Sequence, residues 1–110
     1  MDPQQQDAIK QTLDRMWTKF LSQTMERVAI LEDAAAAFSA DQLSAEQRQA
    51  AHAAAHKLAG ALGTFGLDRG TELARELEAM YYSENDLTAA HAAQLSSHVA
   101  EIRTLIENRK

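Results

Sequence analysis

Several kinds of residue are scarce or absent in this chain. It has no cysteine, one proline and four glycines among its 110 residues. The lack of cysteine excludes disulfides, thiolate metal sites, haem attached through thioethers and cysteine nucleophiles. Valine and isoleucine together number only six, which are too few and too scattered to build a sheet. The chain must therefore depend on a packed helical core for its stability.

Long apolar runs and clusters of basic residues are also missing. No run approaches the ~20 residues that span a bilayer, and Met1-Asp2-Pro3-Gln4 lacks the layout of a secretion signal. The 16 acidic residues outnumber the 11 basic ones and give a net charge of −5, which disfavours binding to nucleic acid. We expect a cytoplasmic chain that binds neither nucleic acid nor a membrane and forms one domain over residues 1–110.

Alanine makes up about a fifth of the chain, and this composition favours helices. Asp2 followed by Pro3 is typical of a helix start, because an aspartate cap then precedes a proline at the first helical position. From there apolar residues recur at the three- and four-residue spacing of a buried helix face. We expect this stripe to lie in the core: Ile9, Leu13, Met16, Trp17, Phe20, Val28, Leu31, Ala35 and Phe38.

Caps and stops mark three further helices. Ser44 and Gln47 have the spacing of a capping box, and Gly66 supplies a left-handed stop for the same helix. Asp68 is expected to cap the third helix, and Thr88 to open the fourth. Short connections force neighbouring helices to run antiparallel. The sequence thus predicts an all-α protein, an antiparallel four-helix bundle with helices over residues 3–39, 44–65, 68–82 and 88–109.

His56 stands out in the second helix. On a helical wheel it lies opposite the apolar face, so its imidazole should point into solvent. The residues that could cover it, three, four and seven positions later, are the small Ala59, Gly60 and Gly63. Glycine in a helix interior costs ~1 kcal/mol relative to alanine, so we interpret this small-residue floor as access for another protein's backbone. The expected core face comprises Ala50, Ala51, Ala54, Leu58, Ala61, Leu62 and Phe65.

The run from His56 to Gly66, HKLAGALGTFG, resembles the signature of histidine-containing phosphotransfer (HPt) domains. In that family of four-helix bundles an exposed histidine is followed by an apolar residue two positions on, a glycine four positions on and another glycine about ten positions on. The helix layout of the whole chain fits as well. The similarity continues past the turn through Leu67, Gly70, Leu73, Ala74 and Glu78.

The resemblance implies a two-component phosphorelay module in which His56 accepts a phosphoryl group from a receiver-domain aspartate and passes it to another receiver. The response-regulator receiver would supply Mg²⁺, and this chain would bind no cofactor. A hybrid histidine kinase, in cis or in trans, is a further implied partner. The sequence has no P-loop and no kinase-type glycine-rich loop, so no autokinase activity is expected. We expect a monomer that docks its receiver through Gln49, His52 and Ala53, beside His56.

Ala59 departs from the family pattern, which has lysine or arginine three positions after the histidine. Lys57, one position after His56, is our candidate for a cation that swings toward the phosphoryl group. A neutral imidazole with an unperturbed pKa of ~6.5 is a competent nucleophile, and positioning and charge neutralisation do most of the catalysis in phosphoryl transfer. We therefore expect the departure to affect the rate of transfer.

The remaining polar residues receive simpler interpretations. His52 and His56 have the spacing of two metal ligands but no third partner on the helix, so no metal site is expected. His91 is interpreted as a partly buried residue of the fourth helix's apolar stripe, and His98 is given no role. The acidic residues are interpreted as a solvated face: Glu72, Glu76, Glu78 and Glu84.

Two alternatives to phosphotransfer through His56 remain open. The first is a helical docking domain, a degenerate HPt domain that binds receivers without accepting phosphate. The second is the phosphoacceptor domain of a chemotaxis-type histidine kinase, which shares the fold but receives its phosphate from ATP bound to a separate domain.

Overall fold

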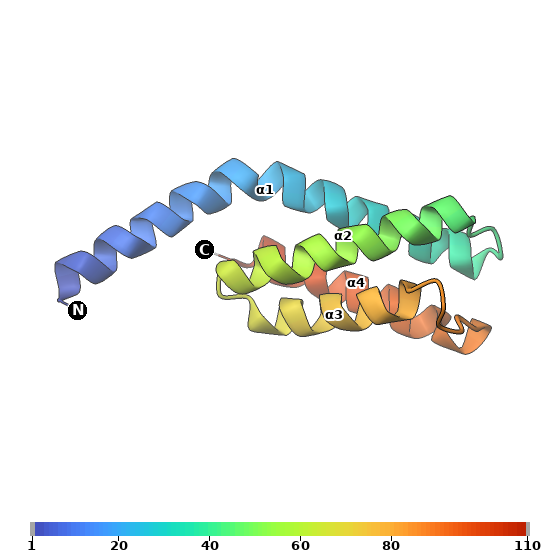
Figure 1. Ribbon diagram of the computed structural model, residues 1–110. Helices are drawn as coiled ribbons and strands as arrows, with labels where there is room; N and C mark the ends of the chain where they lie inside the picture. Colours follow the sequence, from blue (N-terminus) through green and yellow to red (C-terminus); the bar gives the residue numbers. More distant parts are fainter. Residues whose placement is uncertain (1, 110) are drawn as a thin grey trace.

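The computed structural model describes residues 2–109, so residues 1 and 110 of the expected domain lie outside the described part. It contains four α-helices and one short 3₁₀ turn, and no strand occurs between residues 2 and 109 (Figure 1). The expected all-α four-helix bundle is confirmed. The elements are α1 (Pro3–Ser39), α2 (Ala45–Thr64), α3 (Asp68–Tyr81), the 3₁₀ turn η1 (Ala89–His91) and α4 (Ala92–Glu107).

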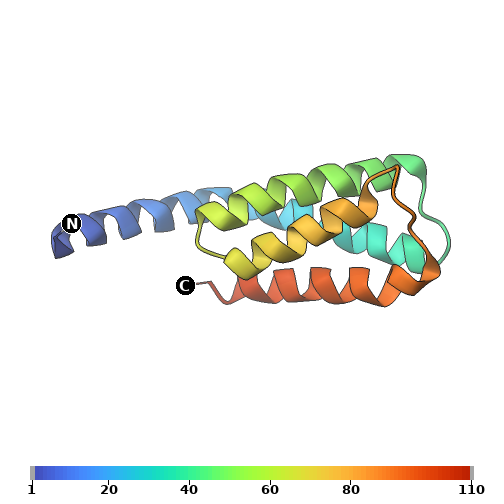
Figure 2. The ribbon, with the colours of Figure 1, turned by 60° about the horizontal axis from the view of Figure 1, so that its bottom comes forward.

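The helices pack as a square around one core. α1 contacts α2 and α4, and α3 contacts the same two helices, with α2 and α3 forming the most extensive pair. The connections between helices alternate between the two ends of the bundle, so consecutive helices run antiparallel, as Figure 2 shows. No helix in the described chain is long and apolar enough to cross a membrane. The largest fully buried apolar side chains come from every helix: Val28, Leu31, Leu58, Leu62, Leu73, Leu77, Leu95 and Ile102.

The predicted starts of α1 and α2 are confirmed in atomic detail. The Asp2 carboxylate accepts a hydrogen bond from the Gln5 amide at 2.9 Å, and the Ser44 hydroxyl accepts one from the Gln47 amide at 3.0 Å. Each glutamine side chain returns the bond to the cap residue's backbone, which completes a capping box. Gly66 has φ of +80° and ends α2 as expected, because only glycine adopts that conformation without a steric penalty.

The predicted starts of the third and fourth helices need correction. Leu67, not Asp68, is the N-cap of α3, and it makes no side-chain cap bond. Asp68 lies in the first turn, where its negative charge interacts favourably with the helix dipole. Thr88 precedes η1 rather than α4, so α4 begins at Ala92 and ends at Glu107, which makes it shorter than predicted. His91 is half-buried, and its Nδ1 accepts a hydrogen bond from the Thr88 amide at 3.0 Å. It therefore stabilises a turn and is not part of the core.

The first part of α1 extends beyond the bundle (Figure 1). Ile9, Met16 and Phe20 are 47%, 39% and 40% exposed, so their predicted place in the core is wrong. Length is the reason: α1 has 37 residues and α2 has 20, and at 1.5 Å per residue about 25 Å of α1 finds no partner along α2. The core begins at Trp17, whose ring meets Phe65 edge to face with centroids 5.1 Å apart.

Candidate functional site

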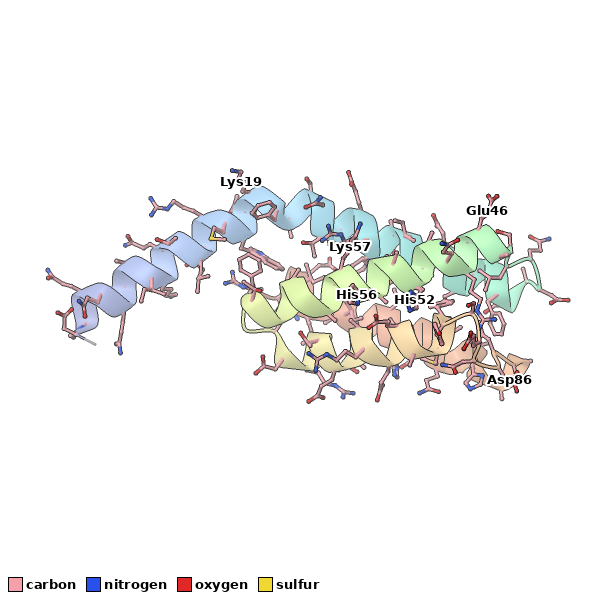
Figure 3. The ribbon with its side chains drawn as sticks, in the orientation of Figure 1. Lys19, Glu46, His52, His56, Lys57 and Asp86 are labelled. Carbon is pink, nitrogen blue, oxygen red and sulfur yellow. The ribbon has the colours of Figure 1, made fainter. Side chains whose placement is uncertain are left out.

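His56 lies in the middle of α2 on the edge that faces α3, and its side chain is 72% exposed. Figure 3 shows it beside His52, on the side of α2 that faces α3. The prediction that its imidazole reaches solvent is confirmed. Its Nδ1 lies 2.7 Å from Oε2 of Glu78 on α3, so the ring is also held by a carboxylate that the sequence analysis had assigned to a solvated face.

The contact with Glu78 sets the chemical state of the imidazole. A carboxylate accepts hydrogen bonds, so Nδ1 carries the proton and donates it to Oε2. The second ring nitrogen, Nε2, then holds a lone pair in the exposed part of the ring. Glu78 is itself only 26% exposed, which limits solvent screening of this pair. The arrangement fixes the orientation of the ring and leaves Nε2 free to act as a hydrogen-bond acceptor or a nucleophile.

The position of Glu78 follows from the helical hairpin that α2 and α3 form. His56 and Glu78 stand equally far from Leu67 in the turn, eleven positions each. Residues equidistant from the turn of an antiparallel hairpin lie opposite one another. His52 and Tyr82 follow the same rule, and their rings lie 5.8 Å apart. This symmetry is the signal in the sequence that could have paired His56 with Glu78.

His52 is the second histidine near Glu78. Its Nε2 lies 4.0 Å from the same Oε2 that accepts the bond from His56, and its side chain is 35% exposed. One carboxylate oxygen thus lies within reach of two imidazoles that are one helical turn apart on α2. Within residues 2–109 no group of three or more suitable side chains could hold a metal ion.

The small residues beside His56 behave differently from one another. Gly60 is exposed, and a Cβ atom added there would meet nothing within 4 Å. Gly63 is also exposed, but a Cβ there would lie 3.2 Å from the Thr71 hydroxyl of α3. Ala59 is only 6% exposed, and its carbonyl accepts a hydrogen bond from the same hydroxyl at 2.8 Å. The predicted exposure of Ala59 beside His56 is therefore wrong.

A rotation of α2 explains that error. Ala50 was expected in the core and is exposed, whereas Ala55, which was not among the expected core residues, is fully buried. Both differences have the same sign and correspond to a turn of roughly 40° about the helix axis. The cause is the extensive contact with α3, which draws one edge of α2 inward. His56 remains exposed despite this rotation because it lies on the side of α2 opposite the core.

The other predicted site residues are at the surface. Lys57 is exposed, and Figure 3 places it on the α1 side of α2, away from the side that carries His56. Gln49 and Ala53 are exposed and His52 is half-buried, so the surface expected to dock a receiver is accessible. Its role in docking stays a prediction.

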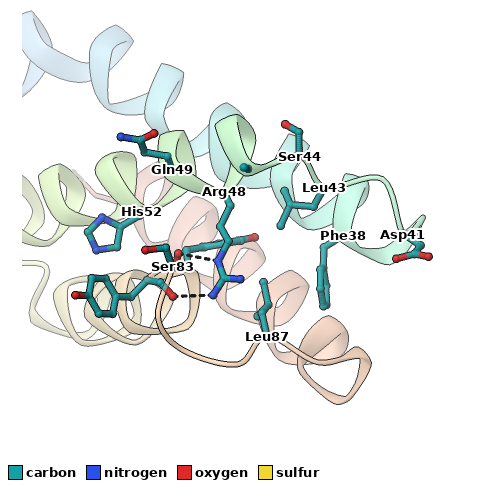
Figure 4. A pocket seen from close by; sticks show the side chains of 12 residues that line it. Phe38, Asp41, Leu43, Ser44, Arg48, Gln49, His52, Ser83 and Leu87 are labelled. Atoms are coloured by element: carbon teal, nitrogen blue, oxygen red, sulfur yellow. Dashed lines mark hydrogen bonds between the residues drawn. The ribbon is translucent and has the colours of Figure 1, made fainter.

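Arg48 was missed by sequence reasoning. It lies in a cavity of about 750 Å³ that His52 also borders, between the α1–α2 turn and the connection from α3 to α4 (Figure 4). Its Nε donates to the Tyr81 carbonyl at 3.0 Å, and its Nη2 donates to the carbonyls of Tyr82 and Asn85. The guanidinium therefore holds the end of α3 and the following connection in place. These bonds occupy most of the N–H donors of Arg48, so we assign it a structural role.

Among the ion pairs that lie away from His56, two show how neighbouring helices are joined. His98 is 14% exposed and contacts Glu76 of α3 through Nε2. Arg103 of α4 binds the Glu32 carboxylate of α1 through Nε at 2.7 Å and Nη2 at 2.8 Å. This bond lowers the pKa of Glu32 from its usual value. Both pairs join helices, so His98 has a structural contact that the sequence analysis did not predict.

Comparison with known proteins agrees with this geometry. The model of the Hpt domain family matches residues 15–108. Protein RcaC of Microchaete diplosiphon is 32% identical over 96 residues, which cover 87% of this chain and 15% of RcaC. The chain thus spans a small part of that relative's length, and no solved structure matches it. On the family match and the four-helix fold together, the chain belongs to the histidine-containing phosphotransfer (Hpt) domains, the phosphotransfer modules of two-component phosphorelays.

Proposed function

We propose that His56 accepts a phosphoryl group from the phosphorylated aspartate of a receiver domain and passes it to a second receiver. The observation that carries the proposal is the state of its imidazole. The side chain is 72% exposed while Nδ1 is held by Glu78 at 2.7 Å. By contrast His52 is 35% exposed and His98 is 14% exposed, so their rings are less accessible to an incoming phosphoryl group.

The transfer step needs no proton movement at the reacting nitrogen. The Nε2 lone pair of His56 attacks the phosphorus of the acyl phosphate, the bond from phosphorus to the aspartyl oxygen breaks, and the aspartate leaves as a carboxylate. The imidazole gains a positive charge while Nδ1 keeps its proton. Glu78 stabilises that charge through the 2.7 Å hydrogen bond. The same step in reverse delivers the phosphoryl group to the next receiver.

In this proposal, the partner neutralises most of the negative charge on the phosphoryl oxygens. Ala59 offers no cation and Lys57 lies on the other edge of α2, so Lys57 can contribute only by extending its long stem. We propose that the receiver brings Mg²⁺ and that this chain binds no cofactor. The exposed residues Gln49 and Ala53, with Gly60 beside the ring, let the receiver approach closely. One copy of the bundle carries the whole site, so we propose that it acts as a monomer. We also propose that it acts in the cytoplasm.

The proposal is tested with a receiver domain whose aspartate carries a radioactive phosphoryl group, in the presence of Mg²⁺. We expect label on this chain in an acid-labile, base-stable form, and we expect His56→Gln to abolish it without loss of helicity. His98→Gln, which removes another half-buried ion pair with a glutamate, is the matched control and should keep the label. Label that survives His56→Gln would overturn the assignment of His56.

The same experiment separates the two alternatives. A degenerate docking domain would bind the receiver, as measured by calorimetry, without accepting label. A phosphoacceptor domain of a chemotaxis-type kinase would be labelled from ATP and a separate kinase domain faster than from a phosphorylated receiver. We expect transfer from the receiver to be the faster reaction.

A further inference from the structure

We propose that His52 is a positioning residue for phosphotransfer: when protonated, it competes with His56 for Glu78 and so makes transfer more strongly dependent on pH. This inference rests on the proposed function of His56. It starts from one geometric fact, that Oε2 of Glu78 is 2.7 Å from Nδ1 of His56 and 4.0 Å from Nε2 of His52.

The two contacts differ in kind at neutral pH. The bond to His56 has the length of a charge-assisted hydrogen bond, whereas 4.0 Å is the outer limit of an ion pair. A neutral His52 therefore leaves Glu78 to His56. A protonated His52 attracts the carboxylate, and because the same oxygen serves both rings, a movement toward Nε2 of His52 lengthens the bond to Nδ1 of His56.

Burial makes this competition effective. The side chain of His52 is 35% exposed and that of Glu78 is 26% exposed, so the interaction between them is screened less than one in open solvent. The His52 ring also rests against Tyr82, with centroids 5.8 Å apart. That contact limits the directions in which the His52 ring can turn.

Other charged groups lie around the pair on several elements. On α2, Arg48 is one turn before His52, and its guanidinium is bound by the carbonyls at the end of α3. Asp41 borders the same cavity as His52, and Arg75 lies three positions before Glu78 on α3. No ion pair of α1 or α4 within residues 2–109 includes His52 or Glu78. Free carboxylates and guanidinium groups ordinarily titrate outside the range of about pH 6 to 8.

The consequence for transfer has a definite sign. Protonation of His56 itself removes the nucleophile, and this gives an acid limb in every variant that retains His56. Protonation of His52 weakens the hydrogen bond that orients the remaining neutral His56 rings and stabilises their developing positive charge. Transfer to the wild type should therefore fall more steeply below pH 7 than transfer to a variant without His52.

The test measures the rate of label transfer from a phosphorylated receiver between about pH 6 and 8, for the wild type and His52→Gln. The quantity compared is the ratio of the two rates, which cancels the receiver's own pH dependence and any pH-independent loss of docking. We expect the ratio of His52→Gln to wild type to rise about two- to fivefold from pH 8 to pH 6, which corresponds to about 0.4–1 kcal/mol. A ratio that stays constant across this range would overturn the proposal.

Two further variants test whether His52 acts through Glu78. In a Glu78→Gln background the rise in the ratio should disappear, because the amide carries no charge for a protonated His52 to attract. His98→Gln removes an equivalent histidine that pairs with Glu76, away from His56, and should show no rise. A rise that persists with Glu78→Gln would mean that His52 acts directly on the phosphoryl group, contrary to the proposal.

A measurement without phosphate separates this proposal from the proposed function. The ¹⁵N shifts of the His56 ring, followed by NMR over the same pH range, should show a second inflection that coincides with titration of His52 and is lost in His52→Gln. Its absence would refute the coupling even if His56 is labelled normally. Its presence, together with a wild type that accepts no label, would instead refute the proposed function.

Discussion

Gly60 offers a direct test of whether stability has been given up for access to His56. It lies inside α2, four residues before the helix ends at Thr64, and a Cβ added there would meet nothing within 4 Å. Glycine in a helix interior is about 1 kcal/mol less favourable than alanine, and here no clash reduces that difference. We therefore expect Gly60→Ala to raise the free energy of unfolding by about 0.5–1 kcal/mol, measured from the midpoint of urea denaturation.

The same change should slow phosphotransfer. The side chain four positions after His56 projects back over that residue's own turn of the helix, so a methyl group would narrow the floor beside the imidazole and the carboxylate of Gly60→Glu would cover it. We expect Gly60→Glu to transfer label at least about tenfold more slowly than the wild type, because small misplacements of the reacting groups greatly lower the rate. Gly63→Ala is the control and should be less stabilising, because its methyl would lie 3.2 Å from the Thr71 hydroxyl. A destabilised Gly60→Ala, or a Gly60→Glu variant that transfers normally, would refute this reasoning.

Two predictions concern stability. The Tyr81 hydroxyl is buried without a hydrogen-bond partner among residues 2–109, and burial raises the pKa of Tyr81 to about 12. Tyr81→Phe should thus raise the free energy of unfolding by about 1 kcal/mol at pH 7. Burial disfavours the phenolate, so the wild type should lose stability relative to Tyr81→Phe as the pH rises from the unfolded pKa of about 10 toward 12, as measured by circular-dichroism melts. A destabilised variant at pH 7 would contradict the reasoning. Deletion of residues 2–11 should change the midpoint of urea denaturation little, because Ile9 is 47% exposed. A decrease of several kcal/mol in the free energy of unfolding would show that this segment belongs to the core.

Local signals in the sequence were sufficient to identify the four α-helices, although not to place every helix start. The capping boxes at Asp2 and Ser44 and the left-handed Gly66 depend on residues within four positions of each other, so they can be recognised without knowledge of the partner helices. The start of α4 was wrong because a cap signal at Thr88 does not distinguish a 3₁₀ turn from an α-helix. Likewise the apolar stripe on α1 does not reveal where the neighbouring helices end, and Phe20 was misplaced for that reason.

The site divides in the same way. The exposure of His56 follows from its position opposite the apolar face, and a rotation of α2 leaves that result unchanged. Ala59 and His52 lie nearer the boundary of that face, where the packing of α3 decides whether a residue is exposed. The bond between His56 and Glu78 joins residues 22 positions apart, so no pattern within one helix contains it. It could be predicted only by treating α2 and α3 as a hairpin with a defined register.

The alanine at position 59 and the carboxylate at position 78 belong to one packing arrangement. Ala59 is 6% exposed, and its carbonyl is bound by Thr71 of α3. At Gly70 the helices approach so closely that an added Cβ would lie 2.9 Å from the Leu62 side chain. A lysine at position 59 would begin inside this contact and would have to extend its stem out of it, whereas alanine fits.

The close contact between α2 and α3 in turn brings Glu78 within hydrogen-bond distance of His56. The carboxylate can stabilise the positive charge on a phosphorylated imidazole but not the negative charge on the phosphoryl oxygens. Under the proposed function, this chain would favour the nucleophile and would leave the charge of the phosphoryl oxygens to cations of its partner. It follows that the rate of transfer should depend more on the receiver's Mg²⁺ and basic residues than on any cation of this domain.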